Sequence, residues 1–149
     1  MKLQVYLDTT VISAAEDERA PDRRAETLAF FARAREFTLV TSELARTEVL
    51  ATPDLDRRNA MIARLGTMRI IPVEPEMTAL ARDYVTSNII PSAYEDDAIH
   101  IAAAVLSAQD VLASWNFRHL VNRRRRSLVN LLNASRGLPT IEIVTPSEL

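Results

Sequence analysis

The chain has 149 residues, of which 48% are hydrophobic, and this suits one globular domain over residues 1–149. The absence of cysteine excludes disulfides, thiolate nucleophiles and zinc–cysteine sites, and two glycines are too few for a phosphate-binding loop or a dinucleotide fingerprint. The net charge of -2 provides no global field that would attract nucleic acid. Charges interrupt every apolar run and the first residues do not resemble a signal peptide, so we expect a cytoplasmic protein without a membrane span.

Strand and helix patterns alternate along the first half of the chain. Residues 3–7 alternate apolar and polar side chains and end at Asp8, which is typical of a strand. The elements that follow are a helix over about 22–35, a strand over 37–41, a helix capped by the Ser42 side chain, and a helix from Pro53 to Gly66.

The second half continues this alternation. Ser92 to Glu95 fits a capping box, which opens a helix over about 96–107 made almost entirely of small and apolar residues. The remaining expected elements are a strand over 69–73, a helix after Pro75, a strand over 111–115, a basic helix to about Ser135 and a strand over 141–144. This order predicts a three-layer α/β/α sandwich around a mostly parallel sheet.

Two polar residues follow predicted strands directly. Asp8 follows the first strand and Asn116 the fourth, so in a parallel sheet both lie at the carboxyl edge, where sites form. Each alone is also explained as a cap or turn residue.

Two further carboxylates lie on predicted helices. Glu48 shares a helix face with Leu44 and Ala45, where a charge is costly unless it is paired or metal-bound; an arginine such as Arg46 is the alternative partner. Asp97 begins a buried stretch and is poorly explained by capping, while Asp96 is the alternative third acid.

Clustered carboxylates repel one another unless a cation holds them, and oxygen ligands favour Mg²⁺ or Mn²⁺. Asp8, Glu48 and Asp97 are therefore candidate ligands, with Asn116 beside them and Thr9 and Ser114 as hydrogen-bonding supports. The pattern favours packing among helices over metal binding for His100. Arg118 and the run Arg123 to Arg126 form either a solvated helix face or a phosphate-binding surface.

The ordered motifs around these residues resemble those of PIN domains, in particular the VapC-type toxins. The motifs are Leu7-Asp8-Thr9, the helical Glu48 in residues 42–49, Asp97 in residues 97–104, and Ser114 to His119 around Asn116. The resemblance covers nearly the whole chain.

This resemblance implies an α/β/α sandwich and a Mg²⁺- or Mn²⁺-dependent endoribonuclease that hydrolyses RNA as the toxin of a toxin–antitoxin pair. It makes Asp8, Glu48 and Asp97 the metal site, and it places Asn116 where many members carry a fourth acid. It also implies a homodimer and a small antitoxin protein, for which Leu28 and Phe31 are candidate exposed contacts.

Two other functions compete with this one. A haloacid-dehalogenase-like phosphatase needs a second acid where Thr10 stands and a lysine downstream, but Lys2 is the only lysine. A catalytically weak PIN-like module that acts by binding RNA or protein is favoured by Asn116 and opposed by the three acids.

Overall fold

The computed structural model describes residues 1–149. Its strands are β1 (Leu3–Leu7), β2 (Phe37–Ser42), β3 (Arg69–Ile71), β4 (Val111–Ala113) and β5 (Glu142–Val144). Its α-helices are α1 (Thr9–Ala14), α2 (Pro21–Ala32), α3 (Glu43–Leu50), α4 (Leu55–Leu65), α5 (Pro75–Thr86), α6 (Glu95–Leu106) and α7 (Arg123–Ser135). Three short 3-10 helices are η1 (Ala34–Glu36), η2 (Ser92–Tyr94) and η3 (Pro146–Glu148). No helix is both long and apolar enough to cross a membrane.

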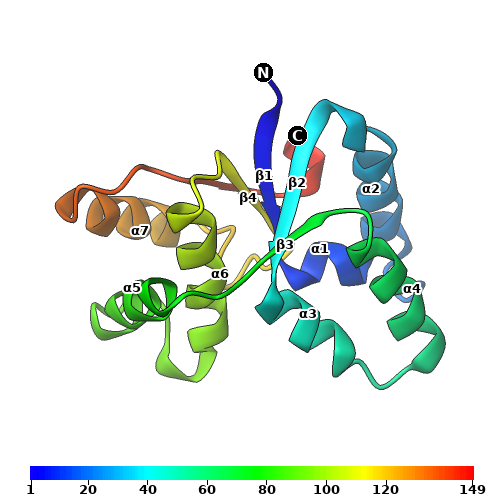
Figure 1. Ribbon diagram of the computed structural model, residues 1–149, viewed down its shortest axis with the longest axis horizontal. Coiled ribbons are helices and arrows are strands. Elements are labelled where there is room, and N and C mark those ends of the chain that lie inside the picture. Colours follow the sequence, from blue (N-terminus) through cyan, green and yellow to red (C-terminus); the bar gives the residue numbers. More distant parts are fainter.

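The five strands form one fully parallel sheet in the order β3-β2-β1-β4-β5. Helices α5, α6 and α7 lie on one side of the sheet and α1 to α4 on the other, which gives the expected three layers (Figure 1). The chain moves outward from β1 through β2 to β3 and then returns to the other side of β1 for β4. The direction of the strand order therefore reverses beside β1, and such a switch opens a crevice at the carboxyl ends of the strands.

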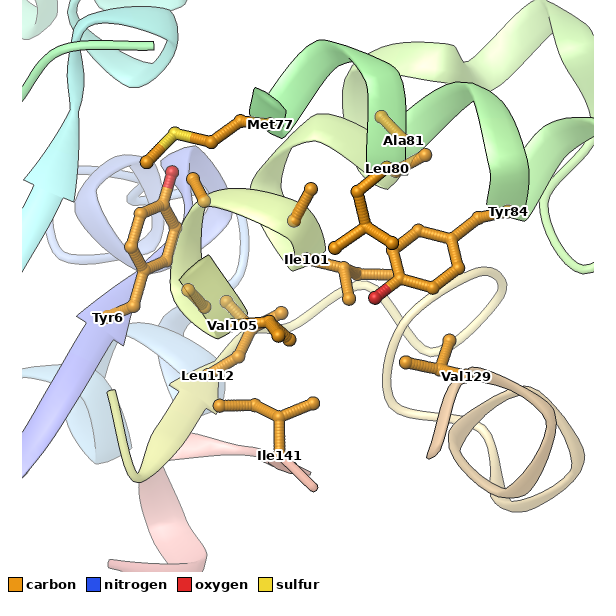
Figure 2. Close-up of a cluster of buried hydrophobic side chains, with 14 of the residues drawn as sticks. Tyr6, Met77, Leu80, Ala81, Tyr84, Ile101, Val105, Leu112, Val129 and Ile141 are labelled. Carbon is orange, nitrogen blue, oxygen red and sulfur yellow. The ribbon is translucent and has the colours of Figure 1, made fainter. Parts of the chain in front are cut away.

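Alternation along the strands divides the core between the two faces of the sheet. Tyr6 of β1 faces the α5, α6 and α7 layer, as Leu112 of β4 does, and Figure 2 shows both among buried side chains of these helices. Val5 and Leu7 face the opposite way, into a second cluster with residues of α1 and α2. A third cluster joins α1, α3 and α4. Asp8 then follows a strand that is buried on both faces.

Several expected boundaries move by a few residues. The strands expected to end at Val73 and Trp115 end at Ile71 and Ala113, because pairing with their neighbours stops there. The helix expected to run to Arg35 ends at Ala32 and continues as η1. The helix after Pro53 ends before Gly66 as expected.

Two expected helix caps are wrong. The Ser42 side chain makes no capping hydrogen bond with α3; its hydroxyl instead lies 2.7 Å from the Tyr6 hydroxyl. Ser92 to Glu95 forms no capping box, because residues 92–94 turn as η2 and Tyr94 takes the cap position of α6. Glu95 forms an ion pair with Arg82 of α5 at 3.2 Å.

The expected exposed apolar surface around Leu28 and Phe31 is also wrong. Both side chains are half-buried, since α2 packs against η3 and α1. The Phe30 and Phe31 rings pack edge to face, with their centres 5.5 Å apart. The Arg64 guanidinium lies over the Phe31 ring, 4.5 Å from the ring centre.

Candidate active site

Strand register brings the residues that follow β1 and β4 together. Leu7 pairs with Ala113, so Asp8 and Ser114 come next to each other beyond the sheet. The Ser114 hydroxyl donates to Asp8 Oδ2 at 2.5 Å, and the Asp8 backbone N–H donates to the Ala113 carbonyl at 3.3 Å. This confirms that Ser114 supports Asp8.

Asp8 also begins α1, as its alternative explanation required. Its Oδ1 accepts the backbone N–H groups of Thr10 and Val11, at 3.0 and 3.4 Å, and the Thr10 hydroxyl at 2.5 Å. The Thr10 hydroxyl in turn accepts the N–H of Trp115 at 2.8 Å. The 2%-exposed carboxylate is therefore held by donors from both connections.

Glu48 lies on α3 and points toward the same region. Its Oε1 accepts the Thr9 hydroxyl at 3.0 Å and lies 2.6 Å from His100 Nε2. Arg46, the alternative partner, instead approaches Glu43 at 3.7 Å. The Glu48 carboxylate thus pairs with a histidine from α6 and accepts a hydrogen bond from Thr9, the residue that follows Asp8.

His100 connects this carboxylate to the buried sheet. Its Nδ1 lies 2.7 Å from the Tyr6 hydroxyl, which lies 2.7 Å from the Ser42 hydroxyl. His100 is buried among helices, as the pattern indicated. A continuous line of polar groups runs from Ser42 through Tyr6 and His100 to Glu48.

Asp97 is the acid of α6 that faces the end of β4. Its Oδ2 accepts Asn116 Nδ2 at 3.2 Å and lies 2.9 Å from His119 Nδ1. Asn116 Oδ1 accepts the His119 backbone N–H at 3.0 Å, and the Asn116 N–H donates to the Ser114 hydroxyl at 2.9 Å. Asp96 is exposed and makes no such contact, so the geometry favours Asp97 over Asp96.

These contacts join the four residues that the sequence singled out. Ser114 and Asn116 link Asp8 to Asp97, and His100 links Glu48 to the helix that carries Asp97. We call Asp8, Glu48, Asp97 and Asn116 the acidic site. Its members come from four different parts of the chain and meet at the carboxyl edge of the sheet.

Burial and charge act in opposite directions on the acidic site. Burial raises the pKa of Asp8, although the nearby His100 and the Ser114 and Thr10 hydroxyls partly offset this. Burial also acts to raise the pKa of Glu48, but the hydrogen bond and charge of His100 outweigh it and the pKa is lowered.

His100 experiences the reverse balance. Burial acts to lower its pKa, but the hydrogen bond and charge of Glu48, with the charges of Asp8 and Asp97, raise it overall. The carboxylates of the acidic site therefore favour protonation of His100.

The donor atoms of the acidic site suit a hard divalent cation, because they are carboxylate oxygens. Glu48 Oε2 and Asp97 Oδ1 accept no hydrogen bond from the protein, whereas both oxygens of Asp8 accept hydrogen bonds from neighbouring groups. No three acidic or histidine side chains lie close enough together to form a coordination sphere as they stand. The chemistry of the donors fits a cation, and its binding would require side-chain adjustment.

The arginine run at the start of α7 divides into two pairs. Arg125 donates to the Ile89 carbonyl, and Arg126 donates to the Ile143 carbonyl at 2.9 Å. Arg123 and Arg124 are exposed and make no hydrogen bond through their side chains. Of the four arginines, only Arg123 and Arg124 therefore have side chains free to contact a phosphate backbone.

Sequence reasoning missed the roles of Tyr6 and His119 and treated His100 as packing. Two spacing signals point to them: Tyr6 lies two residues before Asp8, and His100 lies three after Asp97 on one helix face. His119 carries no such signal, because its position depends on the turn after Asn116.

Comparison with family models and with curated proteins finds no match. Among solved structures, VapBC2 of Rickettsia felis, bound to a DNA fragment from its promoter, matches with a TM-score of 0.59 at 15% identity, over 95% of this chain and 97% of that one. VapC20 of Mycobacterium tuberculosis, a sarcin–ricin-loop-cleaving toxin, matches with a TM-score of 0.59 at 12% identity, over 77% and 92%. This chain has the PIN-type fold of the VapC proteins, as its motifs predicted.

Proposed function

We propose that this protein is an endoribonuclease that hydrolyses RNA phosphodiester bonds with Mg²⁺ or Mn²⁺. The observation that carries the proposal is the acidic site, in which hydrogen bonds hold Asp8, Glu48 and Asp97 at the switch point of the sheet. Structural neighbours with the same fold include a toxin that cleaves the sarcin–ricin loop. The sequence motifs and the site chemistry support the same reaction class.

In this proposal the three carboxylates hold the cation and the surrounding residues hold the carboxylates. The lowered pKa of Glu48 keeps it ionised at neutral pH, as a cation ligand requires. Ser114 orients Asp8, and Asn116 orients Asp97. When bound, a divalent cation neutralises charge on the phosphodiester and lowers the pKa of a water molecule.

We also propose that the protein acts as the toxin of a toxin–antitoxin pair, as a homodimer with a small antitoxin partner. Support comes from the family resemblance of the motifs and from the fold shared with VapBC2, a complex that binds a promoter fragment. Co-expression with the protein encoded next to this one, followed by light scattering, tests both forms of association. A strictly monomeric species at micromolar concentration would count against the dimer.

A second candidate function is binding without cleavage. It is favoured by Asn116, which donates to Asp97 where a fourth acid would act as a ligand, and by the lack of three groups in coordinating range. Such a module would bind RNA or protein and leave RNA intact.

Cleavage of single-stranded RNA, measured with Mg²⁺, Mn²⁺ and EDTA, distinguishes the two functions. Asp8→Asn, Glu48→Gln and Asp97→Asn should each remove most cleavage without unfolding the protein. Asp96→Asn is the matched control, because Asp96 is the exposed neighbour of Asp97. Full activity in EDTA would exclude a metal-dependent reaction. An equal loss of cleavage in Asp96→Asn would exclude the acidic site as the specific place of catalysis.

A further inference from the structure

Glu48 has the longest and most exposed acidic side chain of the acidic site. Its side chain is 35% exposed, against 21% for that of Asp97, while Asp8 is buried. A long side chain loses more conformational entropy than a short one when it is fixed in one position. The residues that hold Glu48 therefore contribute to its ability to act as a ligand.

The Glu48 carboxylate accepts hydrogen bonds from two side chains, both at the same oxygen. The Thr9 hydroxyl lies 3.0 Å from Oε1, and His100 Nε2 lies 2.6 Å from it. Thr9 follows Asp8, whereas His100 comes from α6, the helix that also carries Asp97. Two donors from different elements thus fix Oε1 and leave Oε2 without a hydrogen bond from the protein.

The His100 ring is itself held at its other nitrogen. Nδ1 lies 2.7 Å from the Tyr6 hydroxyl, and the two rings meet edge to face with their centres 5.8 Å apart. Because an ionised carboxylate only accepts, Nε2 carries the hydrogen of the bond to Glu48. Tyr6 then either donates to Nδ1 of the neutral ring or accepts from the imidazolium. Both arrangements keep both contacts, so the orientation of the ring does not depend on its charge.

Tyr6 and His100 are buried beside a core of apolar side chains, in which Figure 2 shows Tyr6. Burial raises the pKa of the Tyr6 hydroxyl, which therefore stays protonated. Apolar groups of the same shape could replace a buried hydrogen-bonded pair at little cost in stability. Packing alone thus does not require this line of polar groups, and its one end that reaches solvent is Glu48.

We propose that His100 is a positioning residue that presents Glu48 Oε2 to the divalent cation, and that Tyr6 holds the His100 ring in place from the sheet. This inference rests on the proposed metal-dependent function and adds two residues to the support of its site. Helix α6 then positions two of the three acids: it carries Asp97 and holds Glu48 through His100.

The test is the affinity of the RNA-free protein for Mn²⁺, measured by isothermal titration calorimetry at one fixed pH. His100→Gln and His100→Asn are the deciding pair. The glutamine amide nitrogen reaches the place of Nε2 and can still donate to Glu48, whereas the asparagine amide reaches only the place of Nδ1. His100→Asn should weaken Mn²⁺ binding by about 10- to 100-fold, and His100→Gln should restore most of this loss.

A second pair of variants tests Tyr6 and leaves His100 intact. Tyr6→Phe removes one hydroxyl and should weaken Mn²⁺ binding by about two- to tenfold. Tyr84→Phe is the matched control, because Tyr84 is the other buried tyrosine of the same core cluster and its hydroxyl donates to Asn133. Figure 2 shows the two tyrosines on opposite sides of this cluster. Tyr84→Phe should bind Mn²⁺ like the wild type.

Melting temperatures check that every variant is folded, and if the His100 variants do not fold, the tyrosine pair decides. Equal Mn²⁺ affinity in the wild type and His100→Asn would overturn the inference. Equal losses in the Gln and Asn variants, or in the two tyrosine variants, would also overturn it, because these side chains would then serve the fold alone.

The inference and the proposed nuclease function fail in different ways. A wild type that binds Mn²⁺ but cleaves no RNA would overturn the nuclease function and leave the positioning of Glu48 standing. A wild type that cleaves RNA, with Mn²⁺ affinity unchanged in His100→Asn and Tyr6→Phe, would overturn the positioning alone. A wild type that neither binds Mn²⁺ nor cleaves RNA would overturn both.

Discussion

Replacing Asp8 by alanine and by asparagine separates the charge of this side chain from its hydrogen bonds. Asp8→Ala removes the cap of α1, which costs about 1 kcal/mol. It also leaves the fully buried Ser114 hydroxyl without its acceptor, which costs about 1–3 kcal/mol. The sum is about 2–4 kcal/mol, or a melting temperature lower by roughly 4–16 °C for a chain of this size.

Asp8→Asn keeps the amide oxygen that accepts the Thr10 and Val11 N–H groups and removes the buried charge. Burial raises the pKa of Asp8 in the folded state, so ionisation near neutral pH destabilises the fold. The stability that protonated Asp8 contributes is complete below its unfolded pKa and is lost as the pH rises through its folded pKa. Asp8→Asn should therefore melt at or above the wild-type temperature at pH 7, and this advantage should shrink as the pH falls through the folded pKa of Asp8 and be lost below its unfolded pKa, near pH 4.

The same thermal-shift series tests the cation. A cation that binds only the folded state, at a concentration a hundredfold above its Kd, stabilises that state by about 2.7 kcal/mol. Mn²⁺ should therefore raise the wild-type melting temperature by roughly 5–11 °C. Asp8→Asn should blunt this gain. If Asp8→Asn is as unstable as Asp8→Ala at pH 7, or responds to Mn²⁺ like the wild type, then Asp8 is a structural cap and our reasoning about its charge is wrong.

Three further predictions concern the surroundings of Asp8. Glu48→Gln should lower the pKa of His100 in an NMR titration. Because a raised histidine pKa stabilises the fold only until the pH passes that pKa, the variant should lose this stability at a lower pH than the wild type. An unchanged titration would contradict the pairing of His100 with Glu48. Arg123→Ala with Arg124→Ala should leave the melting temperature unchanged and flatten the salt dependence of RNA affinity, whereas Arg125→Ala with Arg126→Ala should lower the melting temperature by removing bonds to two carbonyls; no difference between the double variants would refute this division. Asn116→Asp replaces the donor to Asp97 by a like charge, so it should destabilise the metal-free protein and enlarge the Mn²⁺ gain; no change in either quantity would mean that Asn116 does not face Asp97 in solution.

Local patterns in the sequence are enough to predict the architecture and the residues that make up the acidic site. The alternation around Val5 and Leu7 indicates which face of the strand is buried, and the helical periodicity around Leu80 and Tyr84 does the same for a helix. Both patterns can be read from neighbouring residues alone. Asp8 and Asn116 were placed because a residue that ends a parallel strand must lie at the carboxyl edge.

Which of these side chains contact one another depends on the tertiary structure. The sequence favours Asp97 and keeps Asp96 as the alternative, and the rotation of α6 about its axis turns Asp97 toward Asn116 and leaves Asp96 exposed. His119 reaches Asp97 only because a turn after β4 folds back on α6. Boundaries and rotations of this kind depend on packing against distant elements, which local periodicity does not encode.

The same reason explains why the expected uses of Ser42 and of the Arg123 to Arg126 run were incomplete. Ser42 has good capping chemistry, but its side chain makes no hydrogen bond to α3, and its hydroxyl lies 2.7 Å from the Tyr6 hydroxyl of the neighbouring strand. Arg125 and Arg126 resemble their neighbours in sequence, yet two carbonyls from distant segments bind them. A polar side chain has several possible partners, and long-range geometry selects among them.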